Sequence, residues 1–239
     1  MSSPSAGQKR IVIVGATGMV GGYALRYALD NPSVGHVTSI GRKKLGISHP
    51  KLVEILHQDF ADCSVLAEVL SGQDAAVFCL GTYTGAVSDE DLRKITVDYT
   101  VEFAGVLHRG SPSAEFSFLS GNGADPTGRS RMAFARYKGQ AEKVLLDLGF
   151  RRVYIFRPAY IYPVEPRKEP NLSHRLRVNC NRDDCCILSR AGRPKRKSRI
   201  DSGEEGPCLT THFKWIKSHA MPSIRSSRNR LRSGKNTEA

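Results

Sequence analysis

Short apolar runs alternate with segments of helical spacing along the chain up to about residue 165. The first run, Ile11-Val12-Ile13-Val14, predicts a buried β-strand, and apolar residues then recur at helical spacing until Asn31 and Pro32 end the helix. The same reasoning predicts further strands at residues 37–40, 52–56, 75–80, 116–119 and 153–156. Strands that alternate with helices in this way are typical of a parallel sheet covered on both faces.

Three further helices are expected between the strands, at about residues 63–70, 88–109 and 130–148. Ser88 and Asp91 have the spacing of a capping box at the start of the second of these helices. Gly149 suits the left-handed position that ends the third. Six strands with intervening helices predict an α/β fold with a doubly wound parallel sheet, the Rossmann fold.

The chain divides into three parts by composition. Residues 1–8 are short, polar and small and predict a disordered N-terminus, and residues 9–165 form the predicted Rossmann domain. Beyond Pro163, prolines interrupt any helix, and basic, Ser and Asn residues follow without sustained periodicity. We therefore expect residues 166–239 to be a basic, largely disordered tail.

The loop after the first strand has the glycine spacing of a dinucleotide-binding site. Gly15 permits the tight turn, Gly18 lets the backbone approach a pyrophosphate, and Gly21 lets the helix pack against the strand. The loop lies directly between a predicted strand and a predicted helix, so phosphates would meet the helix N-terminus. This context makes the glycine pattern much more specific than it is alone.

The residues after the second strand indicate which dinucleotide is bound. Sites that prefer NAD usually carry an acidic residue there, whereas this chain has Arg42 and Lys43, which suit the 2′-phosphate of NADP. We therefore expect NADP as the cofactor, with NAD as the alternative. Asp59 and Phe60 are placed to meet the adenine, and the segment that begins at Leu80 would pass under the nicotinamide. The candidate cofactor-binding residues are Gly15, Thr17, Gly18, Met19, Val20, Gly21, Arg42, Lys43, Asp59, Phe60, Leu80, Gly81, Thr82 and Lys138.

Four segments together resemble the atypical short-chain dehydrogenase/reductase superfamily. They are residues 15–21, 80–82, 119–124 and 156–158. More narrowly, the chain is similar to small NAD(P)H-binding proteins of the Tat-interacting oxidoreductase-like and nucleoside-diphosphate-sugar epimerase-like kind. The resemblance covers about residues 9–174, and the sequence that follows departs from it, so we expect an out-of-family C-terminus.

The resemblance also implies a catalytic set of Ser, Tyr and Lys. Ser120 would orient a substrate carbonyl, and Lys138 would hold the nicotinamide ribose and lower the pKa of a tyrosine four residues before it. That position is Phe134, which has no proton to give. Tyr137 is the candidate substitute acid, although one helical step of about 100° turns it away from the face of Phe134 and Lys138. The candidate catalytic residues are thus Ser120, Lys138 and Tyr137; the alternative is that Phe134 and Tyr137 only pack the helix.

Two functions follow from these observations. The first is an NADP-dependent oxidoreductase or epimerase-like enzyme that acts on a small carbonyl or sugar-nucleotide substrate. The second is a regulator that senses NADP(H) and contacts a protein partner without chemistry. A homodimer through the two longest helices is implied by the resemblance.

The net charge of +13 is concentrated at the C-terminus, where residues 171–239 contain 16 basic and 6 acidic residues. An aromatic base-stacking pattern does not accompany these charges, so a nucleic-acid-binding tail is the less favoured interpretation. We expect no membrane segment and a cytoplasmic location, with a nuclear one as the alternative. No metal site is expected either, because the cysteines lack the paired spacing of a zinc site. They are Cys63, Cys79, Cys180, Cys185, Cys186 and Cys208.

Overall fold

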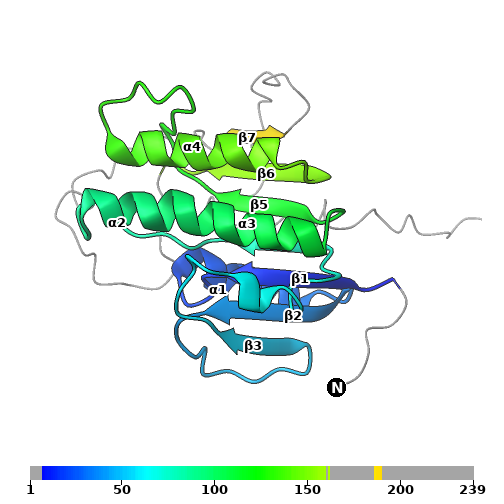
Figure 1. Cartoon of the computed structure of the whole chain (residues 1–239). Coiled ribbons are helices and arrows are strands. Elements are labelled where there is room, and N and C mark those ends of the chain that lie inside the picture. The colour runs from blue at the N-terminus through cyan, green and yellow to red at the C-terminus, as the bar shows by residue number, and fades with distance from the viewer. Residues whose placement is uncertain (1–6, 160, 162–185, 190–239) are drawn as a thin grey trace, which may run out of the picture.

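Figure 1 shows a computed structural model of the chain, which describes residues 7–159, 161 and 186–189. Within these residues, seven strands form one sheet in the order β3-β2-β1-β4-β5-β6-β7. The strands are β1 (Lys9–Val14), β2 (Val34–Gly41), β3 (Leu52–Leu56), β4 (Ala75–Phe78), β5 (Glu115–Leu119), β6 (Arg152–Arg157) and β7 (Cys186–Ser189). The first six pair in parallel, and β7 is antiparallel to β6. The predicted doubly wound fold is confirmed.

The helices lie where the sequence periodicity placed them, with two differences. They are α1 (Met19–Asp30), η1 (Ser64–Leu66), α2 (Asp89–Arg93), η2 (Lys94–Asp98), α3 (Tyr99–Gly110) and α4 (Ala133–Asp147). The predicted helix at residues 88–109 is α2 and α3 joined by one π-helical turn, η2, and Ser88 caps it by accepting a hydrogen bond from the Asp91 amide at 3.0 Å. The predicted helix at residues 63–70 is only the single 3₁₀ turn η1, because a segment of two turns hardly offsets the cost of helix nucleation.

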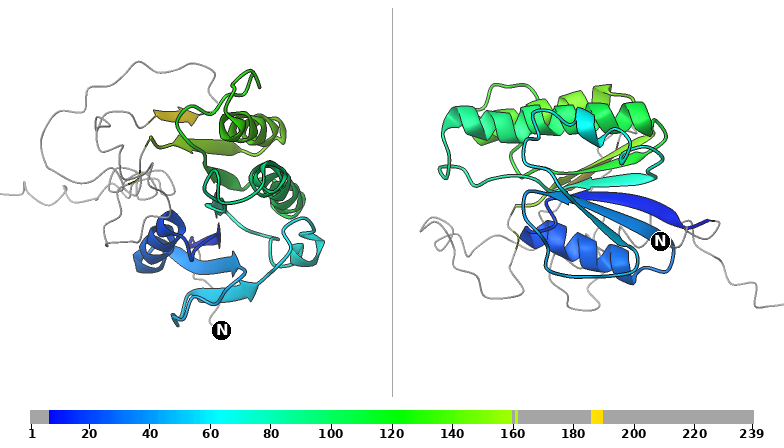
Figure 2. Two further views of the ribbon diagram at one scale, coloured as in Figure 1. Left: turned by 90° about the vertical axis from the view of Figure 1, so that its left-hand side faces the viewer. Right: turned by 60° about the horizontal axis from the view of Figure 1, so that its bottom comes forward.

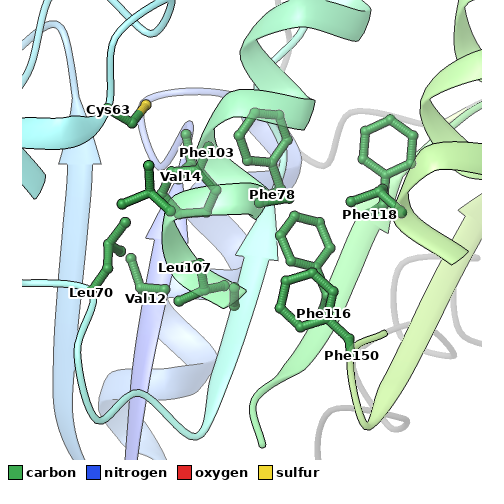
Figure 3. Packing of buried hydrophobic residues seen from close by; sticks show 14 of the residues in the cluster. Val12, Val14, Cys63, Leu70, Phe78, Phe103, Leu107, Phe116, Phe118 and Phe150 are labelled. Carbon is green, nitrogen blue, oxygen red and sulfur yellow. The ribbon is translucent and has the colours of Figure 1, made fainter. Parts of the chain in front are cut away.

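Two hydrophobic cores lie on opposite faces of the sheet, because successive side chains of a strand point to opposite sides. In β1, Ile11 and Ile13 pack with α1, whereas Val12 and Val14 pack on the face that α3 and α4 cover. Figure 2 shows α1 on one side of the sheet and α3 with α4 on the other. Figure 3 shows the larger core, where the rings of Phe78, Phe103, Phe116, Phe118 and Phe150 meet.

The parallel strands all end at one edge of the sheet, and the candidate site residues follow these strand ends. The strand order reverses between β1 and β4, which are neighbours although the chain visits β2 and β3 between them. In open α/β sheets such a switch point is where ligands bind. Cys79, directly after β4, donates its backbone N–H to the Val14 carbonyl at 2.9 Å, so the two loops that follow these strands begin side by side.

Strand β7 is a difference from the sequence prediction, which assigned no packed structure to residues 166–239. The segment Cys186–Ser189 pairs with β6 and covers its outer edge. Its apolar run is too short for periodicity to reveal it among polar neighbours, and only a pairing partner identifies it. The rest of the predicted tail lies outside the described residues, as do residues 1–6 of the predicted N-terminal segment.

Candidate functional site

The glycine loop after β1 is packed so closely that side chains cannot fit at two of its positions. Gly15 has a φ of +84°, and a Cβ there would lie 3.0 Å from the backbone of Cys79 and Leu80. A Cβ on Gly21 would lie 2.2 Å from the Gly15 carbonyl oxygen. The loop therefore turns tightly against the switch point, and the first turn of α1 rests directly on its backbone.

The N-terminus of α1 is suited to an anion. Its N-cap is Gly18, which has no side-chain cap hydrogen bond, and the first turn holds no acidic residue. The N–H groups of a first helical turn have no intrahelical partners, and the helix dipole makes this end positive. Thr17 is exposed, and Met19 and Val20 are half-buried beside it. The glycines leave a backbone surface without side chains next to an uncapped helix N-terminus, and this arrangement fits the pyrophosphate of a dinucleotide.

We expect Gly21→Ala to destabilise the folded chain by about 1–3 kcal/mol, because the added methyl group overlaps the Gly15 backbone. Urea unfolding followed by circular dichroism measures this loss. Gly105→Ala is the matched control, since a Cβ at that α3 position meets only the Arg109 side chain at 3.5 Å. The control should be stabilised by about 0.5–1 kcal/mol through helix propensity. Equal stability of the two variants would contradict the packing of the loop.

The basic residues after β2 lie on a supported loop. Arg42 and Lys43 are both exposed. The Gln58 side-chain amide donates to the Arg42 carbonyl at 2.9 Å, and the His57 backbone N–H donates to the Gly41 carbonyl at 3.0 Å. The loops after β2 and β3 are thus tied together, with the two cations free to meet a ligand on the solvent side.

The residues that were predicted to meet adenine lie in different environments. Asp59 is exposed, and its Oδ1 accepts the Ala61 backbone N–H at 3.0 Å. The Phe60 ring is fully buried in the larger core, 6.0 Å from the Tyr99 ring. Phe60 therefore has only its backbone to offer a ligand, while Asp59 keeps one carboxylate oxygen outside this turn.

The residues after β4 border the glycine loop. Leu80 is half-buried and packs against the larger core, so it fixes the course of the segment. Gly81 is exposed and Thr82 half-buried. This segment lies at the switch point, on the side of the glycine loop that leads toward β5.

Lys138 points from α4 to the end of β5. Its ammonium donates to the Leu119 carbonyl at 2.8 Å and lies 4.6 Å from the centre of the Phe118 ring. Burial lowers the pKa of Lys138 to about 8, although nearby Cys79 and Glu142 act in the opposite direction. The cation is therefore held at the strand edge, next to Ser120, where it could donate to a ribose hydroxyl.

Titration of Lys138 should make the stability of the chain depend on pH. The folded chain releases this proton near pH 8, whereas an unfolded lysine keeps it to about pH 10.4. Between these values the unfolded state binds more protons, so the free energy of unfolding rises with pH, by at most about 1.4 kcal/mol per unit. Denaturant unfolding from pH 7 to 10 should show this rise in wild type and not in Lys138→Met. The exposed lysine variant Lys143→Met, on the same helix, should keep it; a parallel loss there would refute the assignment.

Ser120 lies directly after β5 and is almost fully buried. Its backbone N–H donates to the Phe156 carbonyl at 2.8 Å, and its hydroxyl donates to the carboxylate of Glu142. Glu142 also binds Arg157 at the end of β6, whose Nε lies 2.9 Å from Glu142 Oε1. Sequence reasoning missed Glu142, although its position four residues after Lys138 places both side chains on one face of α4.

Phe134 and Tyr137 point in different directions. The Phe134 ring would touch a Cβ on Gly121 at 3.3 Å, so it lies against the segment that follows Ser120. The Tyr137 hydroxyl donates to Asp89 Oδ2 at 2.6 Å, toward the start of α2, and this bond raises the pKa of Tyr137. The structure thus brings Ser120, Lys138 and Phe134 together and places the Tyr137 hydroxyl at α2.

Among the described residues, no group of three or more His, Cys, Asp or Glu side chains could hold a metal ion. The same part of the chain contains no helix that is long and apolar enough to cross a membrane. Of the cysteines near the C-terminus, only the backbone of Cys186 is described.

Comparison with curated proteins finds relatives that match a little less than two thirds of this chain. The chain is 28% identical over 155 residues to Protein HTATIP2 of Rattus norvegicus, which covers 64% of this chain and 63% of the relative. It is 32% identical over 157 residues to Protein fmp52, mitochondrial, of Aspergillus clavatus, covering 63% of this chain and 66% of the relative. The chain thus spans a little less than two thirds of the length of these relatives. No family model matches it.

Solved structures share the fold. The Bordetella bronchiseptica enzyme WbmH, in complex with NAD+, matches with a TM-score of 0.55 at 16% identity over 64% of this chain and 56% of its own. Uronate dehydrogenase from Agrobacterium tumefaciens matches with a TM-score of 0.50 at 16% identity, over 59% of this chain and 56% of its own. At sequence identities this low, the structural match shows only that the strands and helices share the same arrangement.

The relatives correct the prediction of location. The fungal proteins that match this chain are named mitochondrial. The cytoplasmic prediction is therefore wrong. It depended on composition and on the lack of a recognisable signal, and neither of these detects every targeting sequence that an import receptor recognises.

The family prediction, in contrast, is confirmed. The glycine loop, the strand order and the segment after β5 carry the resemblance in this chain, and the two relatives that bear on it match 64% and 63% of the chain. The chain is similar to members of the atypical short-chain dehydrogenase/reductase superfamily, as the sequence predicted.

Proposed function

We propose that this chain binds NADP(H) through residues 9–165 and acts on a small-molecule ligand beside the nicotinamide. The observation that carries the proposal is the side-chain-free cradle at Gly15 and Gly21, followed along the sheet edge by Arg42 and Lys43. The fold neighbour WbmH, whose structure contains NAD+, supports a nicotinamide dinucleotide. Two cations after β2 favour the dinucleotide that carries a 2′-phosphate.

The activity we propose is that of an oxidoreductase or an epimerase-like enzyme on a small carbonyl or sugar-nucleotide substrate. A bound nicotinamide supplies the hydride chemistry. Lys138 would hold the ribose, since its ammonium already lies at the end of β5 and one of its three donors is used by Leu119. Ser120, the residue after Leu119, would face the ligand beside Lys138. Phe134 stands where the resemblance implies a tyrosine that donates a proton, and the lack of that proton weakens turnover.

A second function, an NADP(H)-sensing protein without turnover, is favoured by one observation. The Tyr137 hydroxyl is bound to Asp89 on the side of α2, so it does not replace the missing phenol beside Lys138. Such a protein would use the same cradle and the same cations. The two functions differ in what a restored phenol at position 134 does to the reaction rate.

Arg42→Ala should weaken NADPH binding by more than tenfold, about 1.4 kcal/mol, and leave NADH binding nearly unchanged. The reason is the loss of a charge-assisted pair with the 2′-phosphate, which NADH lacks. Isothermal titration calorimetry with both dinucleotides measures the difference. Arg109→Ala, which removes an exposed arginine near the end of α3, is the control and should bind both as wild type does. Equal weakening of both dinucleotides would show that Arg42 does not read the 2′-phosphate.

We also propose a mitochondrial location, which the names of the fungal relatives support. Cell fractionation with the full chain tests it, and recovery in the cytosol alone would reject it.

A further inference from the structure

Glu142 joins the ends of two neighbouring strands from the inner face of α4. Glu142 is only 2% exposed. Its carboxylate accepts one hydrogen bond from the Ser120 hydroxyl and another from Arg157 Nε at 2.9 Å. A second contact joins the other carboxylate oxygen to the Arg157 guanidinium. Ser120 follows β5 and Arg157 ends β6, so one buried carboxylate fixes both strand ends at the edge that carries the site.

This arrangement determines the direction of the Ser120 hydrogen bond. A carboxylate that binds a guanidinium through both oxygens is ionised, and an ionised carboxylate only accepts hydrogen bonds. Ser120 must therefore donate to Glu142. A serine hydroxyl has one proton and two lone pairs, so once the proton is used its oxygen can only accept from a further partner.

Phe134 and Tyr137 do not supply a donor for a carbonyl oxygen beside Ser120, and the Lys138 ammonium, which donates to the Leu119 carbonyl, is the cation that the proposed function assigns to the ribose. The Phe134 ring lies against Gly121, directly after Ser120, and has no polar hydrogen. The Tyr137 hydroxyl is bound to Asp89. A carbonyl oxygen that approached Ser120 Oγ would thus meet lone pairs, whereas a hydroxyl group would donate to them.

We infer that Glu142 is a positioning residue that commits the Ser120 proton, so that Ser120 Oγ pairs with a ligand hydroxyl or N–H rather than with a carbonyl oxygen. The inference rests on the proposed function, because it names the chemical class of the ligand that lies beside the nicotinamide. It assigns Ser120 the role of hydrogen-bond acceptor, where the family resemblance implied a donor to a carbonyl.

The test compares two probes of the same shape, cyclohexanol and cyclohexanone, on the full chain saturated with NADP+. Ligand-observed NMR titration gives both dissociation constants. Wild type should bind the alcohol at least fivefold more tightly than the ketone. Ser120→Ala removes the acceptor and should bring the ratio close to one. Glu142→Gln should lower or invert it, because an amide N–H can donate to Ser120 Oγ and release the hydroxyl proton for a carbonyl.

Glu115→Gln is the matched control, because Glu115 forms another Glu–Arg pair between β5 and β6, with Arg152 at the opposite ends of these strands. It should keep the wild-type ratio, and a change there equal to that of Glu142→Gln would overturn the inference. Retained alcohol preference in Ser120→Ala, or equal or undetectable binding of both probes to wild type, would also overturn it. If Glu142→Gln does not fold, the alcohol-to-ketone ratio of Ser120→Ala still tests the inference. Failure of wild type to bind NADP+ in calorimetry would instead reject the proposed function, and this inference with it.

Discussion

Replacing Phe134 with tyrosine should raise the rate of NADPH-dependent carbonyl reduction by about 10²-fold or more, which is the usual contribution of a positioned general acid. Position 134 precedes Lys138 by four residues on α4, so the new hydroxyl lies on the same helix face as the ammonium. The ring already lies against Gly121 and beside Ser120. A cation near a phenol lowers the pKa of that phenol, which prepares the proton for transfer.

Single-turnover oxidation of NADPH, followed by absorbance with a panel of small aldehydes and ketones, measures this gain. Tyr137→Phe is the control, because it removes the hydroxyl that binds Asp89 and should leave the rate as it is in wild type. An unchanged rate in Phe134→Tyr, together with wild-type NADPH affinity, would exclude the enzyme and favour the sensor. Calorimetry on the same variant separates that result from loss of the cofactor.

Five of the predicted strands, β1, β2, β4, β5 and β6, could be found from sequence because each contains a short run with buried positions. Val12 and Val14 lie in one core and Ile13 in the other, so β1 is apolar at every position from Ile11 to Val14 and stands out from its neighbours. The π-helical turn at η2 could not be predicted, because its residues have the same helical spacing as those around it. The spacing of apolar residues thus predicts where a helix lies and does not distinguish an α-helical turn from a π-helical one.

The geometry of the glycine loop was easier to predict than the surroundings of Ser120. Gly15, Gly18 and Gly21 are read from one local motif, whose spacing has a direct steric meaning. Phe60 shows the limit of such reasoning: its place after β3 suggested a ligand contact, and the turn in which it lies directs its ring into the core. The network of Ser120, Glu142 and Arg157 joins residues from three elements, so only the tertiary structure brings it together.

Glu142→Ala should destabilise the chain by about 3–5 kcal/mol, the largest loss that we expect from a single polar residue here. Removing one partner of a buried ion pair leaves the other charge in a poorly solvated place, which costs more than the pair itself contributes. The variant also removes the acceptor of the Ser120 hydroxyl and leaves a hole under α4. Urea unfolding at pH 7, followed by circular dichroism, measures the difference in free energy.

Glu115→Ala is the control that separates burial from charge. It breaks a pair between the same two strands, with Arg152, whose side chain is 53% exposed. Water can solvate that guanidinium, so the control should lose only about 0–1 kcal/mol. Similar losses in the two variants would mean that water reaches Glu142, and then the Ser120 proton would not be committed. A large loss in Glu142→Ala alone would show that the carboxylate holds the ends of β5 and β6 together from within the protein, where its charge can also fix the direction of the Ser120 hydrogen bond.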